Sequence, residues 1–360
     1  MARATERHNV IHIKTKKTLV FSLCGVGALL LLQATSPAAQ PRRLRWTKSA
    51  PLPEPRAGYA AGVLDGKLVI AGGTYWEGEK GNWTKKVFSA RTHAFDPATQ
   101  KWEELPDAPM PFGYAAFTVV ENRLYVLGGY DGENESLKIL TLARQGPKYV
   151  WKIFGELPET RLFGWAVGVG SSIYLLGGVK KFEPMDEAGT CCTSKTATNQ
   201  LQALDTADPD KGWRDLPPYP GGKRWLFSAE TDGESLWMFG GIYTANAEDP
   251  PTKFRQVLRY SFQKRAWEKL PPLPQETLTA MPLVPLHVDG NILFMSFAKT
   301  VWQLDLKTQE FSKLSPLPEE AFVDRFVWLN DQIIGAGGEN KIESPRRRAE
   351  WTFVGRFESE

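Results

Sequence analysis

The chain has 360 residues, of which 42% are hydrophobic and 12% aromatic, and a formal net charge of +3. This composition excludes an intrinsically disordered chain, and the 32 glycines and 26 prolines indicate many turns. The first 39 residues carry +4 of the charge (five Lys or Arg and one Glu), so the remainder is near −1. A near-neutral chain has no electrostatic basis for binding nucleic acid, and we expect no such partner.

Residues 1–39 have the layout of a secretory signal peptide. A basic segment is followed by an apolar run of 15 residues (18–32) and by small residues up to Ala39. The run is short for a membrane span, which needs roughly 20 residues, although an uncleaved anchor is the alternative. We therefore expect cleavage near Ala39, one domain over residues 40–360, no membrane association after cleavage, and a periplasmic or secreted location.

An apolar run that ends in two glycines recurs along the chain. A degenerate sixth copy has Ser296-Phe297 in place of the glycines, and an aromatic residue before a proline-containing turn keeps step with the copies. Repeats of about 40–50 residues built from short strands are typical of a β-propeller. The pairs are Gly72-Gly73, Gly128-Gly129, Gly177-Gly178, Gly240-Gly241 and Gly337-Gly338, and the aromatics are Trp46, Trp102, Trp151, Trp213, Trp267 and Phe311.

Each repeat is predicted to form four antiparallel strands, which in the second copy cover residues 113–120, 123–128, 137–143 and 150–154. Small residues suit the innermost strand, which is crowded near the axis. The glycine pair suits a bend where the backbone packs closely against a neighbour. The aromatic residue of the outer strand is predicted to fill the wedge between diverging blades.

The paired glycines, the aromatic-x-x-Leu-Pro step and the Pro-Arg before the inner strand (residues 55–73) resemble Kelch repeats. The resemblance covers the chain from Trp46 onward and implies an all-β, six-bladed propeller. After Gly338 the chain has one more strand (residues 350–357), whereas residues 45–53 read as an outer strand with no inner strands before it. We therefore expect the N-terminal strand to complete the sixth blade, which removes an open sheet edge.

The loops after the glycine pairs and the turns after the Leu-Pro steps are expected to surround one mouth of the propeller. Three of these loops are long, at residues 74–86, 179–199 and 242–255. Long loops on a rigid scaffold are commonly functional.

Four residues stand seventeen positions before the second glycine of their pairs: Arg56, Phe112, Arg161 and Arg224. Arg325 enters the last repeat at a nearby offset. Arginines that converge on a cleft suit a carboxylate, sulfate or phosphate. The alternative is that each guanidinium braces the loops of its own repeat. Together with Arg346, these five residues are the ligand-binding set that we predict for the mouth.

Motifs for metal or cofactor chemistry are missing from the sequence. After the leader only His93 and His287 remain, there is no zinc-ligand spacing, and there is no nucleophile elbow or phosphate-cradling loop. We therefore expect neither a metal nor a cofactor. The adjacent Cys191 and Cys192 allow either a vicinal disulfide or two thiols.

The leader, the six repeats and the Gly338-Glu339 dipeptide with Arg346 after it also resemble exported N-acetylneuraminate epimerases, the sialic acid mutarotases. This resemblance implies Glu339 as a catalytic base, with Arg161, Arg224 and Arg325 holding a carboxylate. The expected ligand is then an anionic sugar or glycan. The alternative function is a non-catalytic interaction propeller that binds an acidic peptide. In either case we expect a monomer.

Overall fold

The computed structural model describes residues 43–79, 82–183, 193–246, 249–277, 283–296, 299–340 and 348–358. The predicted leader, the Cys191-Cys192 pair and Arg346 lie outside these residues, and what was predicted for them stays a prediction. Residues 41–360 form one compact unit. In its described part the helical segments are two short 3-10 turns, η1 (Pro209–Lys211) and η2 (Gln275–Thr277), and no helix there is long and apolar enough to cross a membrane.

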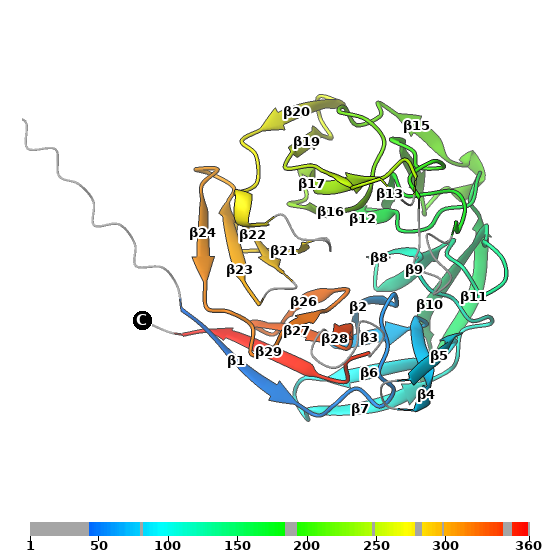
Figure 1. Ribbon diagram of the computed structural model, residues 1–360. Coiled ribbons are helices and arrows are strands. Elements are labelled where there is room, and N and C mark those ends of the chain that lie inside the picture. The colour runs from blue at the N-terminus through cyan, green and yellow to red at the C-terminus, as the bar shows by residue number, and fades with distance from the viewer. Residues whose placement is uncertain are drawn as a thin grey trace, which may run out of the picture. The chain divides into compact units, whose positions relative to one another are not determined.

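Six antiparallel sheets stand around a central axis, so the six-bladed propeller is confirmed (Figure 1). In each blade the innermost strand pairs with the second strand, the second with the third and the third with the fourth. From axis to rim, blade 1 is β2 (Ala60–Leu64), β3 (Lys67–Ala71), β6 (Thr92–Asp96) and β7 (Lys101–Leu105); blade 2 is β8 (Ala116–Val120), β9 (Arg123–Leu127), β10 (Lys138–Gln145) and β11 (Lys148–Glu156); blade 3 is β12 (Trp165–Val169), β13 (Ser172–Leu176), β14 (Leu201–Asp205) and β15 (Arg214–Leu216). Blade 4 is β16 (Trp225–Thr231), β17 (Ser235–Tyr243), β19 (Val257–Ser261) and β20 (Ala266–Leu270), and blade 5 is β21 (Val284–Val288), β22 (Asn291–Met295), β23 (Val301–Asp305) and β24 (Phe311–Leu314).

Blade 6 joins the two ends of the fold. Its inner strands are β26 (Phe326–Leu329) and β27 (Gln332–Ala336), followed by β29 (Thr352–Phe357) and, at the rim, β1 (Leu44–Ser49). All six residues of β1 are in register with β29, from Leu44 opposite Phe357 to Ser49 opposite Thr352. The predicted closure by the N-terminal strand is therefore confirmed.

In the described residues the core consists of six apolar wedges, each between two neighbouring blades, and a smaller cluster of Leu162, Val179, Ala197 and Trp225. The wedge between blades 6 and 1, for example, packs Leu52, Tyr59 and Ile70 against Ile334. Because a propeller blade twists, its outer strands diverge from the next blade, and large side chains fill the widening gap. Two of the outer tryptophans also hydrogen-bond across this gap, from Trp102 Nε1 to the Ala50 carbonyl (3.1 Å) and from Trp151 Nε1 to the Pro106 carbonyl (2.9 Å).

Every glycine pair has positive φ at both positions, for example 66° at Gly72 and 93° at Gly73. In three of the pairs the N–H of the second glycine donates to the next blade: Gly73 to the Phe112 carbonyl (2.7 Å), Gly129 to the Arg161 carbonyl (3.0 Å) and Gly338 to the Arg56 carbonyl (2.7 Å). A strand as regular as β9 ends in two glycines because the chain must turn left-handed there to bond its neighbour.

Replacing Gly178 with alanine is expected to lower the free energy of unfolding by about 3 kcal/mol or more, because a backbone clash adds to left-handed strain of roughly 1–2 kcal/mol. Its φ is 89°, and an added Cβ would lie 2.5 Å from the Leu162 carbonyl oxygen. Gly170 is a matched control, with φ 57° and no atom within 4 Å of an added Cβ. Urea unfolding of both variants measures the difference, and equal losses would contradict the packing argument.

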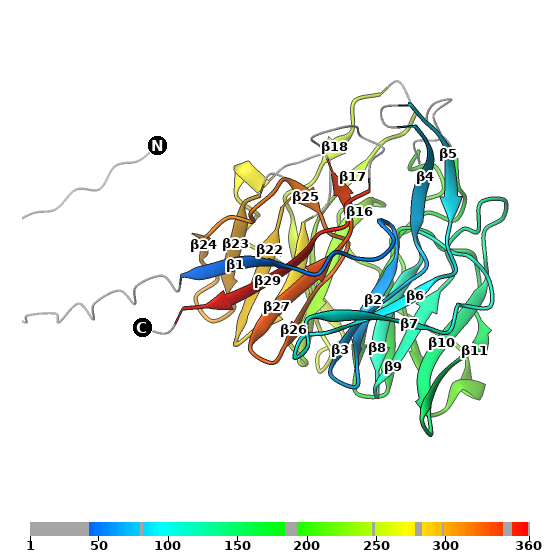
Figure 2. The same ribbon diagram turned by 90° about the horizontal axis from the view of Figure 1, so that it is seen from below.

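Additional strands gather on one side of the ring, at the mouth (Figure 2). The first long loop is not irregular, because β4 (Thr74–Glu79) and β5 (Asn82–Phe88) form a hairpin rich in aromatic and β-branched residues. The third long loop contributes β18 (Thr252–Lys253), which pairs with β17. Blade 6 adds the short pair β25 (Ala321–Phe322) and β28 (Glu339–Asn340).

Candidate functional site

The arginines that share one offset are buried inside their own blades. Arg56 and Arg224 are 0% exposed, and Arg161 is 1% exposed. Arg56 Nη1 donates to the carbonyls of Gly72 (3.2 Å) and Arg91 (2.7 Å), and Nη2 lies 2.7 Å from His93 Nδ1. The guanidinium thus ties the entry of the inner strand to the glycine bend and to the third strand.

Arg224 repeats this arrangement in blade 4, whereas Arg161 in blade 3 bonds side chains through Nη2 and leaves Nε and Nη1 without partners among the described residues. Arg224 Nη1 donates to the Gly240 carbonyl (3.1 Å), and Nη2 donates to Gln256 Oε1 (2.6 Å). Arg161 Nη2 donates to Gln202 Oε1 (3.0 Å) and pairs with Glu159 (2.7 Å). Burial lowers the pKa of each of these guanidinium groups, to about 10 for Arg224.

Phe112 holds the same position in blade 2 and is also buried, with its ring close to Gly72. The structure therefore does not bring Arg56, Phe112, Arg161 and Arg224 together at the mouth. The contacts of the three arginines are those of the bracing alternative, and their regular spacing reflects the regular geometry of the blades.

A cavity of about 130 Å³ does open at the mouth, above the innermost strands. Most of its wall is apolar, and its ionisable lining groups include two carboxyl groups. We call it the mouth pocket. It is lined by Gly58, Tyr59, Tyr114, Ala115, Phe117, Phe163, Gly164, Trp165, Leu226, Phe227, Asp324 and Glu339.

Three of these lining residues hold an unusual backbone conformation. Tyr114, Phe163 and Leu226 have φ of 60°, 51° and 47°, although bulky residues rarely enter the left-handed region. They occupy equivalent positions at the entry of three successive blades, and blade 1 has Gly58 there, with φ 69°. The entries are bonded in sequence, since the N–H of Tyr114 donates to the Gly58 carbonyl (2.9 Å) and the N–H of Phe163 donates to the Tyr114 carbonyl (2.8 Å).

Aromatic rings extend this wall outward along the loops. Tyr114 stacks on Phe163 with ring centroids 4.7 Å apart, and Tyr130 stacks on Phe182 at 4.6 Å. Phe88, at the end of β5, meets both Tyr114 and Tyr130 edge to face. The result is a partly exposed aromatic surface that runs from the first long loop to the second.

Asp324 and Glu339 form the polar side of the mouth pocket. Asp324 Oδ2 accepts a hydrogen bond from the Gly58 N–H (3.0 Å). In blade 6 this carboxylate therefore takes the place of the backbone carbonyl that accepts the equivalent bond between the entries of blades 1, 2 and 3. Glu339 Oε1 is 2.6 Å from Arg348 Nη1, and Arg348 also donates to the Thr74 carbonyl (3.2 Å). The predicted base Glu339 is thus placed in a pocket, and its arginine partner in the described part of the chain is Arg348.

Burial, together with the negative charge of the nearby Glu339, raises the pKa of the Asp324 carboxyl to about 7. The folded protein then binds this proton more tightly than the unfolded chain, whose Asp pKa is near 3.8, so stability should fall as pH rises from about 4 to about 7. Asp324→Asn keeps an acceptor for the Gly58 N–H and should reduce this slope. Urea unfolding between pH 5 and pH 8 tests this, and an unchanged slope would contradict the assignment.

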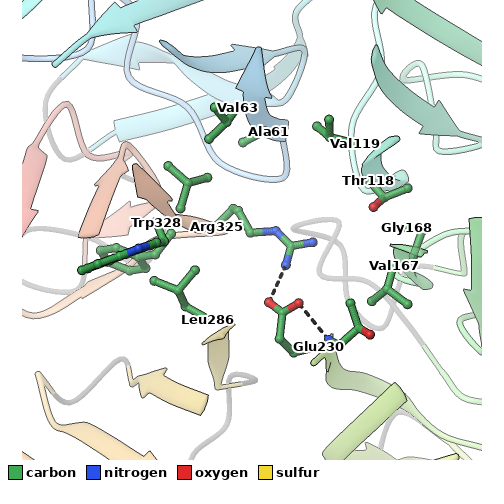
Figure 3. Close-up of a pocket in the computed structure, with 15 residues that line it drawn as sticks. Ala61, Val63, Thr118, Val119, Val167, Gly168, Glu230, Leu286, Arg325 and Trp328 are labelled. Carbon is green, nitrogen blue, oxygen red and sulfur yellow. Dashed lines mark hydrogen bonds and ion pairs between the residues drawn. The ribbon is translucent and has the colours of Figure 1, made fainter. Parts of the chain in front are cut away.

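Arg325 lies apart from the other predicted arginines, on the axis of the propeller beneath the mouth pocket. Its guanidinium carbon is 4.9 Å from the ring centroid of Phe117 and 4.8 Å from that of Trp165. Its nearest charged partner is Glu230 on blade 4, at 3.9 Å. Arg325 and the two rings separate the mouth pocket from a second cavity, drawn in Figure 3.

Comparison with known proteins agrees with this architecture. The profile of the Kelch motif matches residues 55–109, which span blade 1. The chain is a six-bladed β-propeller that contains a Kelch repeat. Kelch-like protein 40 of Xenopus tropicalis is 26% identical over 229 residues, which are 62% of this chain and 33% of that protein.

Other relatives of this chain belong to different classes of protein. A putative F-box/kelch-repeat protein of Arabidopsis thaliana is 34% identical over 137 residues (37% of this chain, 39% of that protein). An N-(sulfonatooxy)prop-2-enimidothioate sulfolyase of Thlaspi arvense is 26% identical over 167 residues, 45% of each chain. The matched segments of this chain thus cover between a third and a half of the length of these curated relatives.

The sequence analysis did not identify Asp324 and Arg348, nor the three residues with left-handed backbone, Tyr114, Phe163 and Leu226. Both lie close to residues that the sequence did predict for the site: Asp324 directly precedes Arg325, and Arg348 is two residues after Arg346. No sequence pattern marks a left-handed tyrosine, phenylalanine or leucine, although alignment with Gly58 at the same offset was an available signal. Within the described residues no group of three His, Cys, Asp or Glu side chains could hold a metal ion.

Proposed function

We propose that this Kelch propeller is a recognition module that binds a partner protein by taking one of its side chains into the mouth pocket. The observation that carries the proposal is the left-handed backbone of Tyr114, Phe163 and Leu226. Such strain costs roughly 1–3 kcal/mol for each residue and clusters at functional sites. Here it places three large apolar side chains around one cavity.

The lining of the pocket defines the side chain it would accept. The aromatic rings favour an apolar or aromatic group, and the carboxyls of Asp324 and Glu339 favour a hydrogen-bond donor at its end. The indole N–H of Trp165 is buried and lacks a hydrogen-bond partner among the described residues. A tyrosine, tryptophan or long basic side chain fits this lining better than an acidic one. The arginines of the blade entries are buried in their own blades and do not line the pocket, whereas two carboxyl groups do.

Relatives alone do not decide between binding and catalysis, since they include Kelch-like proteins and a sulfolyase. The proposal of a protein partner instead rests on the continuity of the mouth pocket with the aromatic surface around Tyr130 and Phe182. An aromatic surface of this kind, wider than the pocket itself, suits a protein segment that extends beyond one inserted side chain.

Selection of a random peptide library displayed on phage against residues 40–360 tests the proposal. Enriched peptides should share an aromatic or long basic residue, and Phe163→Gly should weaken their binding by about tenfold or more, as expected when a buried aromatic contact of about 1.5–3 kcal/mol is lost. Glycine removes the ring and relieves the left-handed strain, so the fold should be retained. Ile153→Ala, at an exposed position on the outer strand β11, is the control.

Binding that is insensitive to both Phe163→Gly and Tyr114→Gly would refute a site at the mouth pocket. Enrichment of acidic peptides would instead support the acidic partner expected from the sequence and would contradict the pocket chemistry proposed above.

The second candidate is an isomerase acting on an anionic sugar, as the resemblance to sialic acid mutarotases implies. One observation favours it: Asp324, with a pKa of about 7, and Glu339 line the same pocket. A general acid–base catalyst works best when its pKa is near the working pH. Exchange between the anomers of N-acetylneuraminate, followed by NMR, should be accelerated by the protein and slowed by Glu339→Gln. A rate equal to that in buffer would exclude this activity.

A further inference from the structure

A second cavity, of about 250 Å³, lies on the axis below the mouth pocket. We call it the axial chamber. The innermost strands of all six blades contribute to its wall, and most of the lining is aliphatic or backbone (Figure 3). Its ionisable side chains are Arg325 and Glu230. The lining residues are Ala61, Gly62, Val63, Thr118, Val119, Ala166, Val167, Gly168, Glu230, Thr231, Leu286, Arg325, Phe326, Val327 and Trp328.

Arg325 reaches from the start of β26 into the middle of this chamber (Figure 3). The side chain is only 13% exposed. Its nitrogen Nη1 is 3.9 Å from Glu230 Oε2, which is longer than a hydrogen bond, and its other contacts are the rings of Phe117 and Trp165. In the part of the chain that the structure describes, this guanidinium makes an ion pair and two ring contacts but no hydrogen bond.

This situation differs from that of Arg56 and Arg224, which lie wholly inside their blades. Arg56 and Arg224 each direct several N–H groups to carbonyls and side chains of their own blade. A guanidinium has five N–H donors, and burying them without acceptors is costly. The two rings contact the guanidinium without accepting conventional hydrogen bonds from it. Arg325 therefore retains donors for a group that enters the chamber.

Glu230 does not meet this need. Its Oε1 accepts a hydrogen bond from the backbone N–H of Thr231 (2.9 Å), which holds the carboxylate at the blade 4 wall. Burial also raises the pKa of Glu230, so its negative charge is disfavoured there. A second carboxylate, brought by a ligand, would bond the guanidinium directly and bidentately, which is the geometry that arginine favours.

We propose that the axial chamber binds a small aliphatic carboxylate, with the carboxylate on Arg325 and the alkyl chain against the aliphatic side chains of the inner strands. The apolar wall includes Val63, Val119 and Leu286, which favour a hydrocarbon tail over a polar one. The volume suits a ligand of a few carbons, below the range of drug-sized pockets, roughly 300–1,000 Å³. This site is independent of partner binding at the mouth.

Isothermal titration of residues 40–360 with formate, propionate and butyrate tests the inference, with butyramide and sulfate as comparison ligands. Affinity should rise from formate to butyrate by about threefold to fourfold for each buried methylene, a factor that corresponds to about 0.8 kcal/mol. Butyramide should bind at least tenfold more weakly than butyrate. Sulfate that binds as well as butyrate would overturn the aliphatic assignment, and equal binding of butyramide would overturn the carboxylate contact.

Two variants locate the site, with butyrate as the probe. Arg325→Gln should abolish binding, whereas Glu230→Gln should strengthen it several-fold because the protein carboxyl group that competes for the Arg325 guanidinium is removed. Arg91→Gln, which removes one exposed arginine of blade 1, should leave affinity unchanged. The Glu230 variant gives a result even if the Arg325 variant fails to fold, and unchanged or weaker butyrate binding to it would refute the site.

Discussion

Deletion of residues 44–49 is expected to lower the melting temperature by about 10 °C or more. The deletion removes Leu44 and Trp46, which pack in the wedge between blades 5 and 6. The Trp46 ring is 6.0 Å from that of Phe326, and its indole N–H donates to the Ser315 carbonyl (3.3 Å). Burial of two such side chains contributes about 2–3 kcal/mol each, and the deletion also leaves β29 as an open edge.

Calorimetry of the intact and shortened proteins measures this effect. Lys48→Ala is the control, because it keeps the strand and removes a salt bridge to Glu319 between partly exposed side chains, worth less than about 1 kcal/mol, and a contact with the Trp351 ring. Melting of the shortened protein within about 2 °C of the intact one would show that blade 6 is stable with three strands, and the closure argument would then fail.

Replacing Arg224 with alanine is expected to lower the free energy of unfolding by about 4 kcal/mol, because it leaves buried acceptors without donors. The carbonyls of Pro220 and Gly240 and the side chain of Gln256 would each lose a hydrogen bond. The guanidinium also covers the Phe254 ring, 4.2 Å from its centroid, and that contact would be lost.

Urea unfolding checks this value, with Arg259→Ala as the control, since Arg259 pairs on the surface with Glu268. Binding of peptides at the mouth should persist in any Arg224 variant that still folds. The opposite result, normal stability with lost binding of an anionic ligand, would restore Arg224 as a ligand contact and contradict the bracing role.

Local regularities in the sequence were enough to predict the fold. The blades need a left-handed bend after the second strand and a large side chain in the gap to the next blade. The glycine pairs and the outer-strand aromatics therefore recur, and the number of copies gives the number of blades. The closure of blade 6 followed from counting strands at both ends of the chain, since an unpaired outer strand and a blade without one complete each other. Strand bounds in blade 2 differ from the prediction by up to three residues, because Gly113 forms only a single bridge, with Tyr130.

The candidate site could be predicted only in part. Glu339, the predicted base, lines the mouth pocket together with Asp324, which the sequence did not indicate. Asp324 precedes β26 and Glu339 follows β27, and the antiparallel pairing of these strands brings the two residues to the same end of the blade. Arg56, Arg161 and Arg224 were identified as one set, yet spacing does not tell whether a long side chain points outward or folds back onto its own blade.

By itself, the sequence determined the six-bladed architecture and the closure of the ring, because repeated short-range packing requirements leave a repeated pattern of residue types. Only the tertiary structure decided that Arg56 and Arg224 donate to backbone carbonyls of their own blades, whereas Arg325 directs its guanidinium into the axial chamber. It also decided that Tyr114, Phe163 and Leu226 line one pocket. The physical reason is that side-chain direction and backbone handedness are fixed by contacts between blades, and those contacts join residues that lie far apart in the chain.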